Sequence, residues 1–486
     1  MSRKNIGLFL LMMMLCAGLC CCAKQRKEEG LLLGGTVITP DRVIHDGWVL
    51  IQRGRIRSVH DTRPDFRASL EIKINGIILP GLIDVHNHPM YGVFPRWNPP
   101  AKFENRYGWR DSPEYKRLIG DPGRELQNKD EQTFCDMEKY GEARALIGGT
   151  TAFVGVSPRA SLPSISKCVI GLVRNLDWHS DFVAGHEIGR EKIENLLGVQ
   201  PRDLNDNRLK DVLDKLQNQK LDTLLVHVAE GRRTDANSKS EFAQLEQKGL
   251  LTAHTGIIHG IALTPLEFLR MKEVGASLIW SPTSNVNLYG ETTDIPAAVK
   301  AGVTLALAPD WSVTGSSNML DELRFAGAWD QSHFGGIVSE KQLVAMATEL
   351  PARIAHIDDK AGSIRDGLYA DLLVVEGDRS RPYWALQNAK PKDVQLVLIA
   401  GEPMYGRLSL LRQIDKSKPF EPIDVCGAQM GIRLTVEDAA IPFGKDTLQD
   451  IRTRLQSLLS SKGISLSPLF ECGPRTAIAA SGAIQN

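Results

Sequence analysis

Short apolar runs that end in polar residues organise the middle of this 486-residue chain. Between residues 81 and 360 these runs alternate with segments whose composition and spacing are helical. Strands that are buried on both faces read as near-continuous apolar runs, and they occur mainly in parallel sheets. The alternation therefore predicts an α/β fold. A distorted TIM-type (β/α)8 barrel is the most economical way to close such a sheet.

Individual elements can be placed within this region. Residues 150–156 (TTAFVGV) read as a buried strand, and residues 293–302 read as a helix that stops at a glycine. Thr264 followed by Pro265 predicts the start of another helix, because threonine caps helices and proline suits their first position. Residues 188–221 are polar and helix-like and contain no clear strand, although a ring of eight strands would need one there.

Two β-rich stretches flank the barrel region. Residues 31–80 and residues 361–410 each contain several short runs rich in Val, Ile and Leu, separated by turn residues. Together they predict a flanking β-sandwich built from the N-terminal and C-terminal segments. Residues 411–486 are expected to form a C-terminal extension with one amphipathic helix over about residues 447–459, whose role the sequence does not indicate.

The N-terminus has the composition of a targeting segment. Arg3 and Lys4 precede an apolar run over residues 6–19, and a cysteine cluster ending at Cys22 follows. A short basic segment and an apolar run of about 15 residues are typical of a secretion signal and too short for an ordinary membrane span. We therefore assign residues 1–30 as a signal segment resembling that of bacterial lipoproteins, lipidated at Cys22. An ordinary cleaved signal and an uncleaved anchor are the alternatives.

Charge and cysteine content narrow the class of protein. Lys plus Arg and Asp plus Glu both number 58, so net charge gives no reason to expect nucleic-acid binding. Cys135 and Cys168 are isolated in sequence and are expected to be buried thiols. Cys426 and Cys472 bracket the C-terminal region, and in an exported protein they can either pair or stay free.

Four apolar runs lead directly into residues that can bind a metal ion. These are His86 and His88 after residues 77–85, His227 after 224–226, His259 after 256–258, and Asp310 after 303–309. Side chains two apart on a strand share a face, so the first two can grip one ion together. Imidazole nitrogen and carboxylate oxygen are zinc ligands, and a catalytic zinc keeps one position open for water. Because the carboxyl ends of barrel strands converge on one face, we expect all five residues in one site.

These segments resemble the amidohydrolase superfamily, and in particular its aminohydrolase branch, which deaminates or dechlorinates nitrogen heterocycles. The matching segments, in family order, are residues 80–88 (PGLIDVHNH), 227–231 (HVAEG), 259–261 (HGI), 281–285 (SPTSN) and 361–372. The resemblance spans about residues 31–407. It implies the distorted barrel with its flanking β-sandwich. It also implies one divalent metal, zinc or alternatively iron, held by the residues matching His86, His88, His227 and Asp310.

The resemblance also implies catalytic roles. Asp310 would take the proton from the metal-bound water, although an Asp after a strand can instead cap a helix. His259 matches the position that holds the attacking water. The alternative for His259 is a purely structural role. Glu230 would protonate the ring nitrogen or the leaving group. The alternative for Glu230 is a loop carboxylate paired with Arg232 or Arg233.

Substrate contacts are less constrained by the sequence. Asn285 would either orient the substrate or cap a loop. Trp311 and Trp97, with Trp109 and Trp280, lie on or near loops at strand ends, where an aromatic wall would suit a planar heterocycle. Ordinary packing is the alternative for each of these tryptophans.

The number of metals can also be argued from lysines. Superfamily members with two metals bridge them with a carbamylated lysine from a middle strand. Lys192, Lys210, Lys215 and Lys220 occupy the polar stretch instead of apolar strand ends, which favours one metal.

The sequence thus predicts an exported enzyme that hydrolyses carbon–nitrogen bonds other than peptide bonds. We expect a deaminase-type aminohydrolase that acts on a cyclic amidine or amide through a metal-bound hydroxide. The alternatives are an amidase for N-acyl amino acids or dipeptides, and a catalytically degenerate surface binding protein. A small-molecule substrate is expected, with no nucleic acid and with membrane contact only through the anchor or signal segment; a homo-oligomer is left open.

Overall fold

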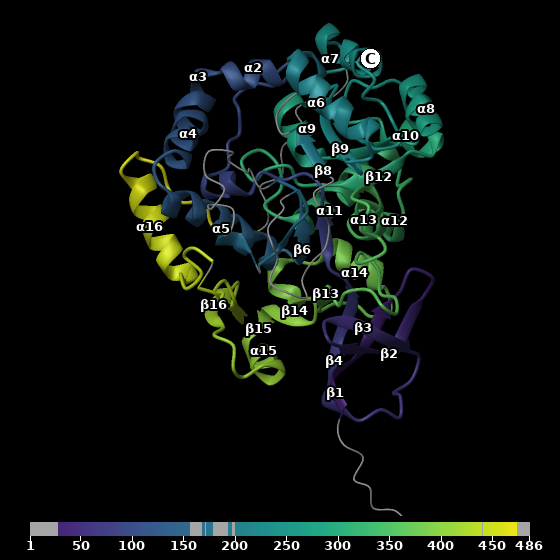
Figure 1. Cartoon of the computed structure of the whole chain (residues 1–486), viewed down its shortest axis with the longest axis vertical. Helices are drawn as coiled ribbons and strands as arrows, with labels where there is room; N and C mark the ends of the chain where they lie inside the picture. The colour runs from purple at the N-terminus through teal and green to yellow at the C-terminus, as the bar shows by residue number, and fades with distance from the viewer. Residues whose placement is uncertain are drawn as a thin grey trace, which may run out of the picture.

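A computed structural model describes residues 28–155, 168–170, 172–177, 193–196, 200–439 and 441–473. The chain forms a parallel α/β unit and, at the other end of the molecule, a mixed β-sheet (Figure 1). The predicted signal segment and its Cys22, and also Lys192, lie outside the described residues. Within the described residues, no helix combines the length and the apolar character that crossing a membrane requires.

In the part of the chain that the structure describes, eight parallel strands make up the α/β unit. They are β5 (Leu82–Asp84), β6 (Thr150–Phe153), β7 (Arg174–Asn175), β8 (Ile193–Leu196), β9 (Thr223–Val228), β10 (Thr255–His259), β11 (Ser277–Trp280) and β12 (Thr304–Leu307). They form a five-stranded arc in the order β12-β11-β10-β9-β8 and a three-stranded arc in the order β5-β6-β7. A bridge between Asn87 and Asp310 joins the ends of β5 and β12. This α/β arrangement is consistent with a TIM-type barrel, although no pairing of β7 with β8 is present among the described residues.

Strand β8 lies in the polar stretch over residues 188–221, in which no clear strand was predicted. Its residues Ile193, Glu194 and Asn195 are only partly buried, and Glu194 pairs with Arg208 and Lys215 of the following helix. A strand with so little apolar content does not produce the hydrophobic run on which sequence prediction depends.

Helices and short helical turns surround the parallel strands or cover the sheet. Those before β9 are η1 (Pro89–Val93), α2 (Arg106–Asp111), α3 (Pro113–Tyr115), η2 (Lys116–Gly120), α4 (Asp121–Gln127), α5 (Glu131–Ile147), η4 (Pro201–Asp203) and α6 (Asp206–Gln217). Those between β9 and β13 are α7 (Ala236–Gln247), α8 (Pro265–Val274), α9 (Pro282–Tyr289), α10 (Ile295–Ala301), α11 (Met319–Trp329), η5 (Asp330–Phe334), α12 (Glu340–Ala345) and α13 (Glu349–Ile354). The later ones are α14 (Pro382–Asn388), η6 (Pro391–Asp393), α15 (Leu408–Ile414) and α16 (Leu448–Ser460). As predicted, Thr264 caps α8, and Pro265 is its first residue.

The N-terminal and C-terminal segments meet in one nine-stranded sheet. Its strands are β1 (Glu28–Ile38), β2 (Val43–Gln52), β3 (Arg55–His60), β4 (Ala68–Pro80), β13 (Leu372–Val375), β14 (Val394–Ile399), β15 (Glu402–Arg407), β16 (Glu421–Val425) and β17 (Ala428–Ile432). The order is β16-β17-β15-β14-β13-β4-β1-β2-β3, and the central pairing is between β4 and β13. The sheet therefore continues into residues 421–432, beyond the expected boundary at residue 410.

A glycine permits the chain to pass from this sheet into the parallel strands. Gly81 separates β4 from β5, and a Cβ at this position would lie 2.2 Å from Oγ1 of Thr151 in β6. Any other residue would push the two strands apart, so the apolar run that leads to His86 can reach the strand ends only with glycine here.

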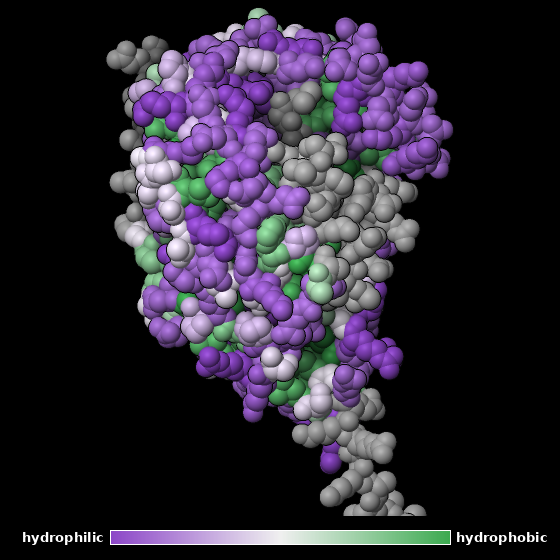
Figure 2. All heavy atoms as spheres, turned by 60° about the vertical axis from the view of Figure 1, so that its left-hand side comes forward, coloured by the Kyte–Doolittle hydropathy of each residue, from purple (hydrophilic) through white to green (hydrophobic). Residues whose placement is uncertain are grey.

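The C-terminal extension packs against helix α5, and α16 lies beside it in Figure 1. Nε and Nη2 of Arg454 each donate a 2.7 Å hydrogen bond to the carboxylate of Asp136. The hydroxyl of Tyr140 donates to the carbonyl of Ser467. The face shown in Figure 2 is mostly hydrophilic, with small separate apolar areas.

Both pairs of described cysteines are disulfide-bonded. Cys426 and Cys472 are joined, so the open alternative of free thiols does not hold. Cys135 and Cys168 are also joined, so the prediction of isolated thiols was wrong. Their partnership depends on the fold, which brings residue 168 back onto α5, and sequence spacing does not reveal such contacts.

Candidate metal centre

The five residues predicted as ligands or their neighbours lie at the carboxyl ends of the parallel strands. His86 and His88 follow β5, His227 is in β9, His259 ends β10, and Asp310 follows β12. The parallel register of β9 and β10 pairs His227 with Ile258, the residue before His259. His227 and His259 therefore lie at nearly the same position along their neighbouring strands. Four of the five side chains are buried, and His88 is partly exposed.

These side chains converge closely enough to hold one ion. His86 Nε2 lies 3.1 Å and His88 Nε2 lies 3.4 Å from Asp310 Oδ1. The His86 and His227 rings are 4.8 Å apart between centroids. Two sets of three side chains could each hold an ion: His86 with His227 and His259, and His86 with His88 and Asp310. Within each set, one donor atom from every residue lies within 4.8 Å of the other two. Three or four nitrogen and oxygen donors in such a space are what zinc accepts.

The electrostatics of the cluster fit a divalent cation. Burial, followed by the neighbouring His86, lowers the pKa of His88 to about 3. The same two causes hold the pKa of His227 well below its usual range. Both imidazoles are therefore neutral and keep a lone pair for a metal. Nδ1 of His227, which is buried, has no hydrogen-bond partner among the described residues, as expected of an atom meant for an ion.

Asp310 is held in place by backbone and side-chain contacts. It adopts a left-handed conformation (φ 64°), which is strained for a residue other than glycine. Its amide donates to the carbonyl of His86, and its carbonyl accepts from the amide of His88. Burial raises the pKa of its carboxyl, but the hydrogen bond and charge of His86 outweigh this effect and lower it, so the group is ionised. The nearby helix α11 is capped by Asn318, which excludes the helix-capping alternative for Asp310.

His259 is oriented by Asn285. His259 Nδ1 lies 2.8 Å from Asn285 Oδ1, and Asn285 Nδ2 donates to Thr292 Oγ1. Because an amide oxygen only accepts, His259 carries its proton on Nδ1, and its Nε2 lone pair is left toward the site. Asn285 is fully buried. Asn285 thus contacts a candidate catalytic residue, and a contact between Asn285 and substrate stays a prediction.

Glu230 lies beside His259 and is buried. Its Oε1 is 3.9 Å from His259 Nε2 and accepts a 2.7 Å hydrogen bond from the hydroxyl of Tyr289. Its Oε2 is 3.4 Å from a guanidinium nitrogen of Arg106. The alternative partners predicted from sequence are engaged elsewhere: Arg232 pairs with Glu104, and Arg233 pairs with Glu291.

The two tryptophans proposed as substrate contacts occupy different places. The ring of Trp311 lies 6.2 Å from that of His88 and 5.5 Å from that of Tyr91, which puts it beside the cluster. Trp97 instead donates to Glu114 and packs on Tyr115, with no ring contact to the histidines. Trp311 thus lies beside the cluster and Trp97 among packed side chains, and contact of either ring with substrate stays a prediction.

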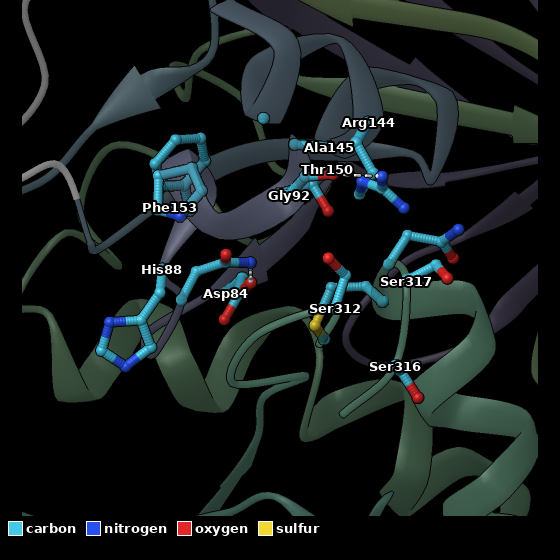
Figure 3. Close-up of a pocket in the computed structure, with 15 residues that line it drawn as sticks. Asp84, His88, Gly92, Arg144, Ala145, Thr150, Phe153, Ser312, Ser316 and Ser317 are labelled. Carbon is cyan, nitrogen blue, oxygen red and sulfur yellow. Dashed lines mark hydrogen bonds between the residues drawn. The ribbon is translucent and has the colours of Figure 1, made fainter. Parts of the chain in front are cut away.

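A small polar cavity lies beside His88 (Figure 3). Asp84 and Ser312 face it from one side and Arg144 from the other, and His88 borders it. Its free space is about 20 Å³, which is room for a water molecule. The Asp84 carboxylate accepts from the amide of His86 and thus fixes the backbone that carries the first histidine pair.

Sequence reasoning missed three buried polar residues near the cluster: Ser284, Arg106 and Tyr289. Ser284 lies within the 281–285 motif, so the motif offered a signal for it. Arg106 and Tyr289 stand in segments without a motif, and only the fold brings them to Glu230. Lys215, considered as a bridging lysine, pairs with Glu194 and Asp211 away from the cluster.

Comparison with known proteins agrees with this site. Residues 204–404 match the model of the Amidohydrolase family. A 5'-deoxyadenosine deaminase of Methanopyrus kandleri is 25% identical over 444 residues, covering 82% of this chain and 98% of the relative. A 5-methylthioadenosine/S-adenosylhomocysteine deaminase of Caldanaerobacter subterraneus is 23% identical, covering 79% and 94%.

Solved structures show the same fold. An adenosine deaminase from Xanthomonas campestris with bound zinc superposes with a TM-score of 0.61 at 21% identity, covering 78% of this chain and 93% of that one. Escherichia coli guanine deaminase gives a TM-score of 0.61 at 18% identity, covering 78% and 100%. The chain therefore contains an amidohydrolase-family domain, and the relatives named above are deaminases. It is a hydrolase of carbon–nitrogen bonds other than peptide bonds.

Proposed function

We propose that this protein is a zinc-dependent aminohydrolase that replaces the ring amino group of an adenosine derivative modified at its 5' position. One observation carries the proposal: four imidazoles, the ionised Asp310 and the buried Glu230 meet at the carboxyl ends of the parallel strands. The names of the sequence relatives supply the substrate class. The overall reaction consumes water, forms an oxo-substituted ring and releases ammonia.

In this proposal His86, His88, His227 and Asp310 hold the single metal. When bound there, the metal supplies a water molecule that is deprotonated near neutral pH. Asp310 would accept a proton there, since its carboxyl is ionised and its Oδ1 faces the histidine pair. Iron remains an alternative metal for the same donor set.

Two further residues complete the proposed chemistry. His259 would hold the attacking oxygen through Nε2, the ring atom left toward the site by Asn285. Glu230 would exchange a proton with the ring nitrogen and so assist the departure of ammonia. Trp311 would stack against the planar ring from the side of His88.

The proposal also covers how the two parallel arcs close and what flanks them. We infer a closed, distorted (β/α)8 barrel, supported by the eight parallel strands and by the bridge between the ends of β5 and β12. The nine-stranded sheet would serve as the flanking β-sandwich. A homo-oligomer remains part of the proposal without a surface assigned to it.

Export is also a proposal. Two disulfides within the described residues favour an oxidising compartment, because such bonds are rare in reducing cytosol. This agrees with the basic and apolar N-terminal segment, for which we propose a lipid anchor at Cys22.

The test is an ammonia-release assay on zinc-loaded protein. We expect release from 5'-deoxyadenosine or 5-methylthioadenosine, with the matching change in ultraviolet absorbance of the purine ring. Asp310→Asn should abolish release while the protein stays folded. Release of an amino acid from N-acyl amino acids, without ammonia from any aminopurine, would instead favour the amidase alternative, which the deaminase relatives do not support.

A further inference from the structure

Behind Glu230 lies a row of buried hydrogen-bonding groups from two other parts of the chain. The indole Nε1 of Trp109, in α2, donates a 2.9 Å hydrogen bond to the hydroxyl of Tyr289, the last residue of α9. That hydroxyl in turn donates to Oε1 of Glu230 at 2.7 Å. Trp109 is 8%, Tyr289 1% and Glu230 3% exposed, so solvent does not compete for these bonds.

The direction of the hydrogen bonds follows from the chemistry of the donors. An indole N–H can only donate, so the Tyr289 oxygen must accept from Trp109. The single hydroxyl proton of Tyr289 is then directed to Glu230 Oε1, which is fixed as an acceptor. Burial, with the adjacent Glu230 carboxylate, raises the pKa of Tyr289 well above its usual range, so the hydroxyl keeps this proton.

The second oxygen of Glu230 has a different neighbour. Oε2 lies 3.4 Å from Nη1 of Arg106, which is in the same helix as Trp109. A backbone bridge between Asn105 and Gly231 fastens the start of this helix to the loop that carries Glu230. Helix α2 is therefore a fixed part of the wall around Glu230, and both carboxylate oxygens are constrained by residues outside the strand-end motifs.

From this arrangement we infer that Tyr289, supported by Trp109, is a positioning residue that holds the Glu230 carboxylate, through Oε1, in the orientation from which it exchanges a proton with substrate. The inference rests on the proposed function. Without the Tyr289 hydroxyl, the Glu230 carboxylate loses its hydrogen bond at Oε1 and keeps only the Arg106 neighbour at Oε2, so it can rotate away from this orientation. The chemical step should then slow, while binding of the substrate ring against Trp311 should change little.

The experiment measures kcat and KM for ammonia release from 5'-deoxyadenosine by zinc-loaded full-length protein. Tyr289→Phe should lower kcat at least about tenfold, with KM changed less than about twofold. In a Glu230→Gln background the same change should have no further effect, because the residue through which Tyr289 acts has gone. Tyr405→Phe is the matched control, since the Tyr405 hydroxyl is also buried but has no hydrogen-bond partner among the described residues.

Each other result overturns the inference. An unchanged kcat in Tyr289→Phe, or losses that multiply in the double variant, would assign Tyr289 to packing alone. If Tyr289→Phe fails to fold or to bind zinc, Trp109→Phe decides, because it keeps a ring and removes only the donor; a normal kcat there rejects the inference. If the wild-type protein releases no ammonia from any aminopurine tested, the proposed function is rejected and this inference with it. If the wild type releases ammonia but the variants do not behave as expected, only this inference is rejected.

Discussion

The hydroxyl of Ser284 donates a 2.6 Å hydrogen bond to Oδ2 of Asp310. Both side chains are buried, and the bond leaves Oδ1 of Asp310 as the oxygen nearest to His86 and His88. Ser284 thereby fixes which carboxylate oxygen faces the metal position. Residues that form hydrogen bonds with metal ligands orient those ligands and tune their basicity.

Ser284→Ala should therefore weaken the site without unfolding the protein. We expect a loss of about tenfold or more in zinc affinity or in kcat/KM, the usual range for removing such a partner. Zinc affinity can be measured by competition with a chromophoric chelator, and activity by ammonia release. Ser281→Ala is the control, because that hydroxyl is buried at the start of the same helix without a hydrogen-bond partner among the described residues. Equal behaviour of the two variants would contradict the role given to Ser284.

Metal content provides a second prediction. Wild-type protein should bind about one zinc per chain, and His86→Ala should lose most of it, because His86 belongs to both possible donor sets. Bound zinc should also raise the stability of the wild type by about 2.7 kcal/mol at a hundredfold excess over Kd, but not that of the variant. Elemental analysis and thermal unfolding with and without a chelator measure the two effects. Two zinc ions per chain would show that a bridging ligand had been missed.

The strand-end ligands could be predicted because apolar runs and metal-binding residues are both visible in the sequence. His227 and His259 each close such a run, and parallel strands bring their ends together whatever lies between them. Strand β8 could not be predicted, since Glu194 and Asn195 break the apolar pattern. The Cys135–Cys168 disulfide depends on tertiary contact alone.

The groups around Glu230 were beyond sequence reasoning for a related reason. The sequence offered Arg232 and Arg233 as partners because they are adjacent in the chain, but Arg106 and Tyr289 take that place in the fold. A buried ion pair or hydrogen bond between distant segments leaves no periodic pattern. Residues that act through another residue are therefore less visible than those that bind the metal.

The disulfide at the C-terminus should stabilise the extension. Cys426 and Cys472 are 46 residues apart, and closing a loop of that size contributes about 2–4 kcal/mol. The double variant Cys426→Ser/Cys472→Ser should lower the urea midpoint of unfolding by a corresponding amount. Reducing agent should lower the midpoint of the wild type but change the variant less, because the remaining Cys135–Cys168 bond is buried. A thiol titration that finds four free thiols in oxidised protein beginning after Cys22 would contradict both bonds.

Glu142, on α5, should make stability depend on pH. Burial raises the pKa of its carboxyl to about 8, although it accepts hydrogen bonds from the Val173 amide and from Asn175. The folded state then binds one more proton than the unfolded state between about pH 4.5 and pH 8. The contribution of this group is complete below that window and is lost as pH rises through it, at up to about 1.4 kcal/mol per pH unit. Urea unfolding across this range should give a steeper fall for the wild type than for Glu142→Gln. The exposed Glu246→Gln should keep the wild-type slope, and parallel curves for wild type and Glu142→Gln would contradict the assignment.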